Sequence, residues 1–482
     1  LLILCSISVN SFSKTENDRN DQYGDFKHQT SNNKHFRMKS QESIPTSKVA
    51  RATQFAKAGV KVGGNYIKHY SKKIFDSSLT KEDLHKENAA DVYDTLSNLK
   101  GSALKVAQMM SMDKSLLPRA YTDKFAMAQY SAPPLSAPLV IKTFKKYFDK
   151  SPSEIFDKFD LQAENAASIG QVHKAEKDGK KLAVKIQYPG IAESISSDLK
   201  MARPLAVTLL NLNDSDIDRY FAEVEDKLLE ESDYELELQR SIEISKACSH
   251  IPNLFFPNYY KEYSSNRILT MDWIEGMHLK EFLDTNPSQE VRNQLGQALW
   301  EFYDYQMHTL KKVHADPHPG NFLFTPDGRL GIIDFGCVKV IPEDYYKQYF
   351  SLMNSDTLKD EDATMKIFWD LEFLLKEDSP ELQVFFAELF KKMIRLLGRP
   401  FNTDVFDFGQ EGYVEEIYEF MEYVSKLPEL RKASSARGSQ HGLYVNRTYF
   451  GLYTILNDLK SVVNISKPEW LTAEHLKLEI RN

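Results

Sequence analysis

The sequence lacks an apolar run long enough to cross a lipid bilayer. A transmembrane helix needs about 20 consecutive, mostly apolar residues, and the apolar stretch Leu1–Val9 is too short for that. This stretch could be the remnant of a signal-peptide core or translated upstream sequence, because the first methionine is Met38. At the other end, Leu452–Asn482 shows no apolar span.

Cysteine is also scarce. The three cysteines, Cys5, Cys248 and Cys337, lie far apart and show no metal-ligand spacing. Such usage is typical of a reducing compartment. We therefore expect a cytoplasmic protein, with a peripheral position at an inner membrane as an open alternative. Cys337 is expected to be a small buried hydrophobe rather than a nucleophile.

The chain has no excess of positive charge. The formal net charge is −8 over 482 residues, which gives no support for nucleic acid as the main partner. Hydrophobic residues make up 42% of the chain, enough for a sizeable core in two or three domains or in one large two-lobed domain. Residues 10–40 have few apolar side chains, so we expect 1–43 to be a disordered or non-native leader. The acidic residues in this leader argue against a mitochondrial transit peptide.

One stretch, by contrast, lacks acidic residues entirely. Thr46–Lys73 holds seven Lys or Arg and no Asp or Glu, within a predicted basic amphipathic segment at 44–84. Such a helix could lie on an anionic membrane surface. Alternatively, it could be a solvated helix that packs its small residues on the main domain, namely Ala52, Ala56, Gly59 and Gly63.

The most informative cluster runs from His314 to Gly336. It reads His-Ala-Asp-Pro-His-Pro-Gly-Asn, then an apolar stretch with an Asp-Gly turn, then Asp-Phe-Gly. This order and spacing is the polar skeleton of a kinase catalytic loop and its metal-binding triplet, although Asp-Phe-Gly alone is a common tripeptide. We predict that Asp316 accepts a proton from the attacking hydroxyl or water. Asn321 and Asp334 would bind Mg²⁺ through oxygen.

Two short strands, 322–324 and 330–333, are predicted around an Asp-Gly turn at 327–328. Such a hairpin would hold Asn321 near Asp334.

A second cluster precedes the first by about 130 residues. Asn165–Val172 is followed by two predicted strands, 172–176 and 182–187, and the second carries Lys185 where a kinase places the lysine that reaches the ATP phosphates. The loop is alanine-rich where a typical kinase loop is glycine-rich, and methyl groups limit how closely the backbone approaches phosphates. The residues predicted to contact ATP here are Ala166, Ala167, Ser168, Gly170 and Lys185.

Two further segments fit a kinase-like arrangement. The acidic stretch 216–249 is predicted to be helical, and a kinase needs one glutamate on a helix to pair with the strand lysine. Arg267–Gly276 reads as an apolar strand that ends in glycine, as a hinge between lobes does, so backbone groups of Asp272 to Ile274 would face the adenine. An ordinary strand and turn is the alternative for this segment.

The remaining regions are predicted to be mostly helical, at 84–147, at 291–313 and from 340 almost to the end. No Ala-Pro-Glu follows the Asp-Phe-Gly, which argues against an ordinary peptide substrate. The apolar face of the 291–313 helix is expected to point inward through Leu295, Leu299, Phe302 and Met307.

Together these residues resemble the UbiB, or AarF-like, family of atypical kinase-like proteins, which is tied to ubiquinone biosynthesis. The match covers roughly Ala90–Val340. Ala166–His173 resembles the family's nucleotide loop, and His314–Asn321 resembles its catalytic loop, including both prolines. The resemblance assigns Glu237 the pairing with the strand lysine.

The resemblance also assigns roles outside the kinase motifs. Lys105 and Gln108 fall on the family's Lys-x-Gly-Gln motif, which lies on a helical extension that folds across the active site and blocks peptide access. Glu231-Ser232-Asp233 matches the family's Glu-x-Asp motif, and Lys105 is expected to contact Glu231 or Asp233.

This chain departs from the family pattern at two positions. Ala107 stands where the family has glycine, so the departure implies a looser approach of the helical extension there. Asn165 replaces the first alanine of the nucleotide loop, which puts nucleotide selectivity by the loop in doubt.

The fold implied by the resemblance is α+β and two-lobed like a protein kinase. The expected parts are the leader at 1–43, the basic segment at 44–84, a helical extension at 85–160, an N-lobe at 161–276 and a helical C-lobe at 277–482. The implied function is that of a Mg²⁺- and ATP-binding kinase or ATPase that supports quinone-biosynthesis enzymes or lipid intermediates at a membrane surface. A nucleotide-dependent scaffold and a conventional Ser/Thr kinase are the alternatives.

Overall fold

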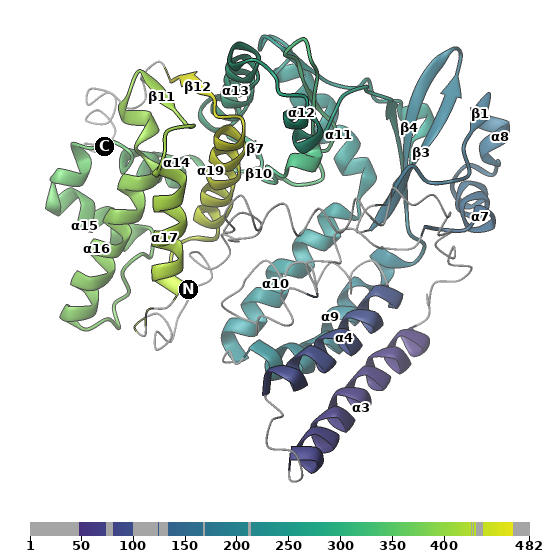
Figure 1. Cartoon of the computed structure of the whole chain (residues 1–482), viewed down its shortest axis with the longest axis horizontal. Coiled ribbons are helices and arrows are strands. Elements are labelled where there is room, and N and C mark those ends of the chain that lie inside the picture. The colour runs from purple at the N-terminus through teal and green to yellow at the C-terminus, as the bar shows by residue number, and fades with distance from the viewer. Residues whose placement is uncertain are drawn as a thin grey trace. The chain divides into compact units, whose positions relative to one another are not determined.

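The computed structural model describes residues 48–73, 81–99, 124, 134–166, 169–210, 214–425, 427, 429 and 437–465. The chain forms two compact units (Figure 1). The N-terminal unit holds the described residues up to Glu235 together with Tyr260–Asp272, and the C-terminal unit holds Leu236–Tyr259 and the described residues from Trp273 onward. Residues 236–259 therefore go with the C-terminal unit, although they lie inside the range expected for the N-lobe.

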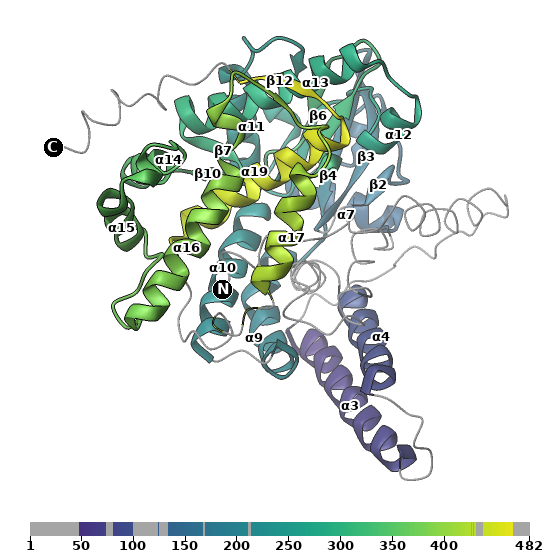
Figure 2. The same cartoon turned by 60° about the vertical axis from the view of Figure 1, so that its left-hand side comes forward.

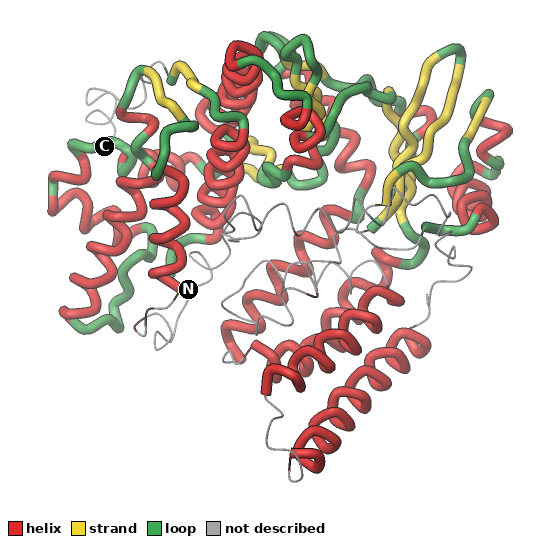
Figure 3. Tube along the Cα trace, in the orientation of Figure 1, coloured by secondary structure: helices red, strands yellow, loops and turns green. Residues whose placement is uncertain are grey.

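The N-terminal unit contains an antiparallel sheet of order β1-β3-β4-β6, with β2 paired to β3 (Figure 3). The predicted turn at Asp178-Gly179 joins β3 to β4, and both of its residues have positive φ, 49° and 75°. This is the type I′ geometry that suits a two-residue hairpin. The strands are β1 Lys158–Phe159, β2 Asn165–Ala166, β3 Gly170–Lys177, β4 Lys180–Gln187 and β6 Ile268–Asp272.

The other elements that the structure describes in this unit are helical. They are α3 Lys48–Lys73, α4 Lys81–Leu99, α7 Ala137–Phe148, α8 Pro152–Ile155, α9 Ile191–Leu210 and α10 Asp214–Glu231, with the short 3₁₀ turn η2 Lys261–Tyr263 before β6. Helix α11, Tyr234–Ala247, begins in this unit and continues into the other.

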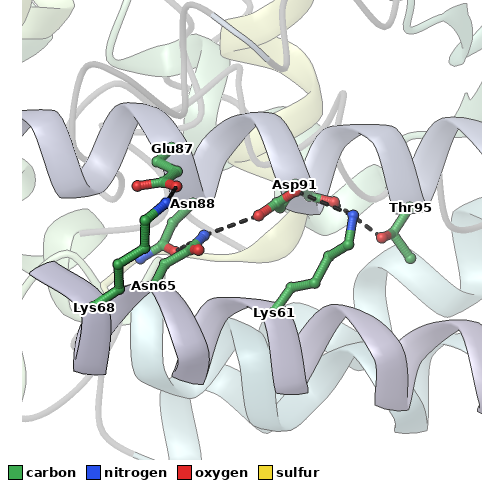
Figure 4. A network of polar contacts seen from close by, with 7 residues as sticks. All are labelled: Lys61, Asn65, Lys68, Glu87, Asn88, Asp91 and Thr95. Atoms are coloured by element: carbon green, nitrogen blue, oxygen red, sulfur yellow. Dashed lines mark hydrogen bonds and ion pairs between the residues drawn. The ribbon is translucent and has the colours of Figure 1, made fainter.

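Helix α3 packs on its neighbours with its polar side. Helices α3 and α4 lie side by side in Figures 1 and 2. Asn65 donates to Asn88 and Asp91 of α4 at 3.0 and 2.9 Å, and Lys61 and Lys68 pair with acids of α4, as Figure 4 shows.

A buried ion pair fixes the first turn of α3 to α9. Nε of Arg51 donates to Asp198 at 2.6 Å, and Nη2 of Arg51 also contacts this carboxylate. The side chains are 1% and 0% exposed, and the Ser194 hydroxyl donates to the same carboxylate at 3.1 Å. Because removing either partner would leave a buried charge uncompensated, this pair determines how α3 docks.

The other side of α3 is open and mostly apolar. Val49, Val60 and Ile67 are 78%, 76% and 73% exposed. The alternative in which the small residues face the main domain is wrong, because Ala52, Ala56, Gly59 and Gly63 are all exposed. The helix does pack on the unit, but through arginine, asparagine and histidine instead.

The C-terminal unit is largely helical. Its strands form three small ladders, β5-β9-β8, β7-β10 and β11-β12. The strands are β5 Leu254–Phe255, β7 Lys312–His314, β8 Phe322–Phe324, β9 Leu330–Ile332, β10 Val338–Val340, β11 Val405–Asp407 and β12 Val462–Asn464. The α-helices besides α11 are α12 Leu279–Asp284, α13 Gln289–Asp304, α14 Glu343–Ser351, α15 Glu361–Asp370, α16 Pro380–Leu397, α17 Tyr413–Ser425 and α19 Gln440–Asp458.

Helix α13 supplies the centre of this unit's core, as its apolar spacing predicts. Leu295, Leu299 and Phe302 are fully buried. The predicted helix ends earlier than expected, because the chain passes through the π-helical turn η3, Tyr305–Leu310, and leaves it at Lys311 with φ 53°. Val313 is therefore in strand β7 and not in a helix, since pairing with β10 determines its backbone.

The described residues form an α+β fold, in agreement with the expectation. Among the residues that the structure describes, no helix combines the length and the apolar character that a bilayer crossing requires.

The burial of the Arg51–Asp198 pair leads to a prediction about stability. Arg51→Ala leaves Asp198 buried without its guanidinium and should lower the free energy of unfolding by roughly 3–5 kcal/mol. Urea titration followed by circular dichroism measures the loss. Replacing both partners, Arg51→Met with Asp198→Leu, should recover most of it, because no buried charge is left.

Lys68→Ala is the matched control. Lys68 joins the same helix to Glu87 of α4, but both side chains are about half exposed, so its loss should cost no more than about 1 kcal/mol. Equal losses for Arg51→Ala and Lys68→Ala would contradict the role given to the buried pair.

Candidate functional site

The segment from His314 to Gly336 folds as two adjoining ladders of the C-terminal unit. Strand β7 ends at His314, which pairs with Val338 of β10, and the Ala315 amide donates to the Cys337 carbonyl at 2.9 Å. The predicted hairpin forms between β8 and β9, with Phe322 opposite Ile332. These ladders place the loop that carries Asp316 beside the Asp-Phe-Gly.

Asp316, Asn321 and Asp334 converge at the ends of these strands. The Asn321 side-chain amide donates to the Asp316 carbonyl at 2.9 Å and to its carboxylate at 3.3 Å. The Ile333 amide donates to the Asn321 carbonyl at 3.2 Å, so Asp334 follows directly beside Asn321. The Asp334 carboxylate accepts from the Gly336 amide at 2.8 Å.

These residues fit a magnesium ion that is shared with a nucleotide. Because the amide nitrogen of Asn321 donates to Asp316, its amide oxygen is left for a cation. Among the described residues, no group of three or more His, Cys, Asp or Glu side chains forms a metal site. Mg²⁺ typically takes one or two carboxylates and completes its shell with water and substrate phosphates, so Asn321 and Asp334 are a sufficient protein contribution.

His314 is a buried packing residue. Its Nδ1 lies 3.0 Å from the Tyr303 hydroxyl, and its ring packs edge-on against Phe335 of the Asp-Phe-Gly at 5.7 Å. Burial lowers the pKa of His314 below its ordinary value, against the opposing effect of Asp316. The buried ring orients the loop through its contacts with Tyr303 and Phe335.

Glu237 lies on α11, buried within the C-terminal unit. A Cβ at Gly336 would lie 3.2 Å from Asp334 Oδ1 and 3.7 Å from Glu237 Oε2. Glu237 is thus close to the Asp-Phe-Gly. Its pairing with Lys185 stays a prediction, because Lys185 belongs to the other unit.

Sequence reasoning missed Arg447. This residue of α19 donates from Nη2 to Asp316 Oδ1 at 2.7 Å, across 131 positions of sequence. One turn later, Gly451 lies against the same loop, where a Cβ would be 2.3 Å from Cγ of Pro317. No local sequence motif identifies Arg447, because its contact with Asp316 depends on how the C-terminal helices fold back onto the loop.

The N-terminal unit carries the predicted nucleotide residues. Lys185 is 9% exposed on β4, and its Nζ lies 5.1 Å from the ring centroid of Tyr234. Gly170 begins β3 and Ala166 ends β2, whereas Ala167 and Ser168 between them lie outside the described residues. The contribution of this loop to ATP binding therefore stays a prediction.

The motif residues near α10 are only partly described. Glu231 ends α10, and the Asp233 carboxylate accepts from the Glu235 amide at 3.1 Å. Lys105 and Gln108 lie outside the described residues, so their expected contact with Glu231 or Asp233 stays a prediction.

The predicted hinge coincides with a passage between the units. Strand β6 ends at Asp272, whose carboxylate accepts from the Tyr260 hydroxyl at 2.6 Å, and the chain returns to the C-terminal unit at Trp273. Ile274 lies in that second unit. The adenine contacts expected from Asp272 to Ile274 stay a prediction.

Comparison with known proteins agrees with this geometry. The family model of the ABC1 atypical kinase-like domain matches residues 127–368. The chain is 29% identical to the yeast (Saccharomyces cerevisiae) protein named atypical kinase COQ8, mitochondrial, over 78% of this chain and 76% of that one. It is 24% identical to a probable serine/threonine-protein kinase, abkA, of Dictyostelium discoideum, over 87% of this chain and 78% of the relative.

A solved structure is similar as well. A Mycobacterium tuberculosis protein solved in complex with erythromycin aligns with a TM-score of 0.55 and 27% identity, covering 83% of this chain and 97% of that one. The matched family model spans both the strand that carries Lys185 and the ladders that carry Asp316, Asn321 and Asp334. The chain belongs to the ABC1 atypical kinase-like family, the UbiB family that its motifs resemble.

Proposed function

We propose that this chain is a Mg²⁺-dependent ATP-binding atypical kinase or ATPase that supports the biosynthesis of a ubiquinone-type quinone. The observation that carries the proposal is the convergence of Asp316, Asn321 and Asp334 in one compact unit. Mg-ATP would supply the transferable phosphoryl group and the cation that neutralises its charge. The relatives named COQ8 support the pathway assignment.

The residues of this chain have separable tasks in the proposed reaction. Asp316 accepts the proton of the attacking hydroxyl or water, while Arg447 and Asn321 hold its two carboxylate oxygens. Asn321 and Asp334 hold the cation, and Lys185 binds the phosphates as a point charge. The missing Ala-Pro-Glu segment favours a lipid, a small molecule or water over a peptide as acceptor.

Asp316→Asn should lower ATP turnover by roughly 10²- to 10⁴-fold, because a positioned base contributes about that much. Turnover of the full chain is measured with Mg²⁺, with and without anionic vesicles and a hydrophobic phenol as a quinone-precursor mimic. Asp327→Asn is the matched control, since Asp327 lies in the exposed turn between β8 and β9 and bonds to Thr325 and Arg329 of that turn. Unchanged turnover in Asp316→Asn would falsify the assignment of the base.

Arg447→Ala should lower turnover by about a hundredfold, because small misplacements of a reacting group cost about that much. Arg447→Lys keeps the charge but offers one compact donor, so its turnover should lie between that of the wild type and that of Arg447→Ala. Arg399→Ala is the control, since Arg399 pairs with Glu416 on the surface of the same unit. Wild-type turnover in Arg447→Ala would show that the Asp316 contact is dispensable.

A nucleotide-dependent scaffold is the second candidate, favoured by the expected occluding helix and the missing peptide platform. In cells that require this protein, a scaffold should tolerate Asp316→Asn but fail with Lys185→Ala, which impairs ATP binding. An enzyme should fail with both. Efficient phosphorylation of peptide libraries would instead support the alternative of a conventional Ser/Thr kinase.

The proposed membrane partner is an anionic lipid surface that meets the outer side of α3. Val49, Val60 and Ile67 are exposed there on a helix that has no acidic residue and carries six lysines besides the buried Arg51. Interfacial helices combine these two features, and each cation near an anionic surface adds about 1 kcal/mol. A second copy of the same helix is a poorer partner, because both would carry the same positive charge.

Ile67→Glu should weaken binding of the full chain to vesicles that contain phosphatidylglycerol by roughly tenfold, through lost apolar burial and added repulsion. Co-sedimentation measures the binding, and phosphatidylcholine vesicles show the dependence on charge. Val384→Glu is the control, because Val384 is similarly exposed on α16. Equal binding by both variants, or a concentration-dependent dimer that Ile67→Glu abolishes, would contradict the lipid assignment.

A further inference from the structure

Tyr234 lies under the ammonium group of Lys185. The ring centroid is 5.1 Å from Nζ, and Tyr234 is fully buried. At this distance the negative face of an aromatic ring attracts a cation, more strongly where water is excluded. Neither the sequence motifs nor the family resemblance assigns a role to Tyr234.

The surroundings of Tyr234 fix the position of its ring. Ser232 lies two residues before Tyr234. Its backbone carbonyl accepts hydrogen bonds from the side chains of Gln187 of β4, at 2.9 Å, and of Arg267, at 2.7 Å. The Tyr234 amide donates to the Asn266 carbonyl at 3.4 Å. The start of α11 is thus tied both to the strand that carries Lys185 and to the residues that precede β6.

The tyrosine also touches the base of the predicted nucleotide loop. A Cβ at Gly170 would lie 2.7 Å from the Tyr234 hydroxyl oxygen and 2.6 Å from the Ile186 carbonyl. Only glycine fits at Gly170 with these neighbours. One buried side chain therefore contacts both elements of the N-terminal unit that are expected to hold ATP phosphates.

We propose that Tyr234 is a positioning residue that holds the ammonium of Lys185 at the height where it meets the phosphates of ATP. An aromatic face suits this task, because it attracts the ammonium and adds no second full negative charge to the one that the predicted partner Glu237 would bring. The inference rests on the proposed function only in taking Lys185 as the phosphate-binding lysine.

Tyr234→Leu should raise both the KM for ATP and the Kd of a fluorescent ATP analogue about tenfold, with a smaller change in kcat. Tyr234→Phe keeps the ring and should stay within about twofold of the wild type. Tyr147→Leu is the matched control, because Lys146 lies 5.0 Å from the Tyr147 ring on α7 of the same unit. This control should leave ATP binding unchanged.

Tyr234→Leu creates space in the core and could simply unfold the unit, so a second series preserves volume. Phenylalanine with one, two or three fluorines at position 234 withdraws charge from the ring face in steps. The Kd of the ATP analogue should rise with each fluorine at a constant melting temperature. A flat series, or an equal effect of Tyr147→Leu, overturns the inference.

Lys185→Ala separates this inference from the proposed function. If Lys185→Ala abolishes ATP binding while the fluorinated series is flat, Tyr234 does not position the lysine but the proposed function stands. If Lys185→Ala binds and turns over ATP like the wild type, the phosphate-binding lysine is wrong, and the role of Tyr234 falls with it.

Discussion

The Asp316 carboxylate is held by two donors from distant parts of the C-terminal unit. Asn321 reaches it from the same loop, and Arg447 reaches it from the last long helix. The carboxylate can bond both groups only while α19 packs on the loop, and the small side of Gly451 permits that packing. The candidate site is therefore a product of the whole unit and not of the motif alone.

The two ladders around this carboxylate position the loop that carries it. Since Phe322 pairs with Ile332 and His314 with Val338, the ends of four short strands meet at one place. Short strands suffice because buried aromatic residues support them, with Phe335 packed against His314. The buried ring of His314 thus links the loop that carries Asp316 to the Asp-Phe-Gly segment.

The N-terminal unit uses polar groups in places where apolar ones are usual. Arg51 is buried against Asp198, and asparagines join α3 to α4, while valine and isoleucine of α3 face outward. A helix that buries charge and exposes apolar side chains costs stability unless its outer side meets something. This reversed arrangement, together with the basic charge of the helix, is the reason to assign a surface partner to α3.

Several features of the structure depend on the local sequence alone. Both predicted hairpins form, since Asp-Gly at 178–179 and at 327–328 favours tight turns between flanking apolar strands. The order of Asp316, Asn321 and Asp334 likewise predicted a site, because these residues are joined through one short hairpin. Interactions within a few residues depend on backbone preferences that neighbouring side chains carry with them.

Other features depended on packing between distant segments. Arg447 joins the site only because α19 returns to the loop, and Val313 becomes a strand residue only because β10 is there to pair with it. The sequence also could not predict which side of α3 packs on the rest of its unit, because the basic side and the side of small residues were both compatible with packing. The sequence by itself determined the tight turns and the short hairpin that joins Asn321 to Asp334, because these depend on neighbouring residues. Only the tertiary structure decided which distant side chains contact Asp316, because burial and long-range pairing exist only in the folded chain.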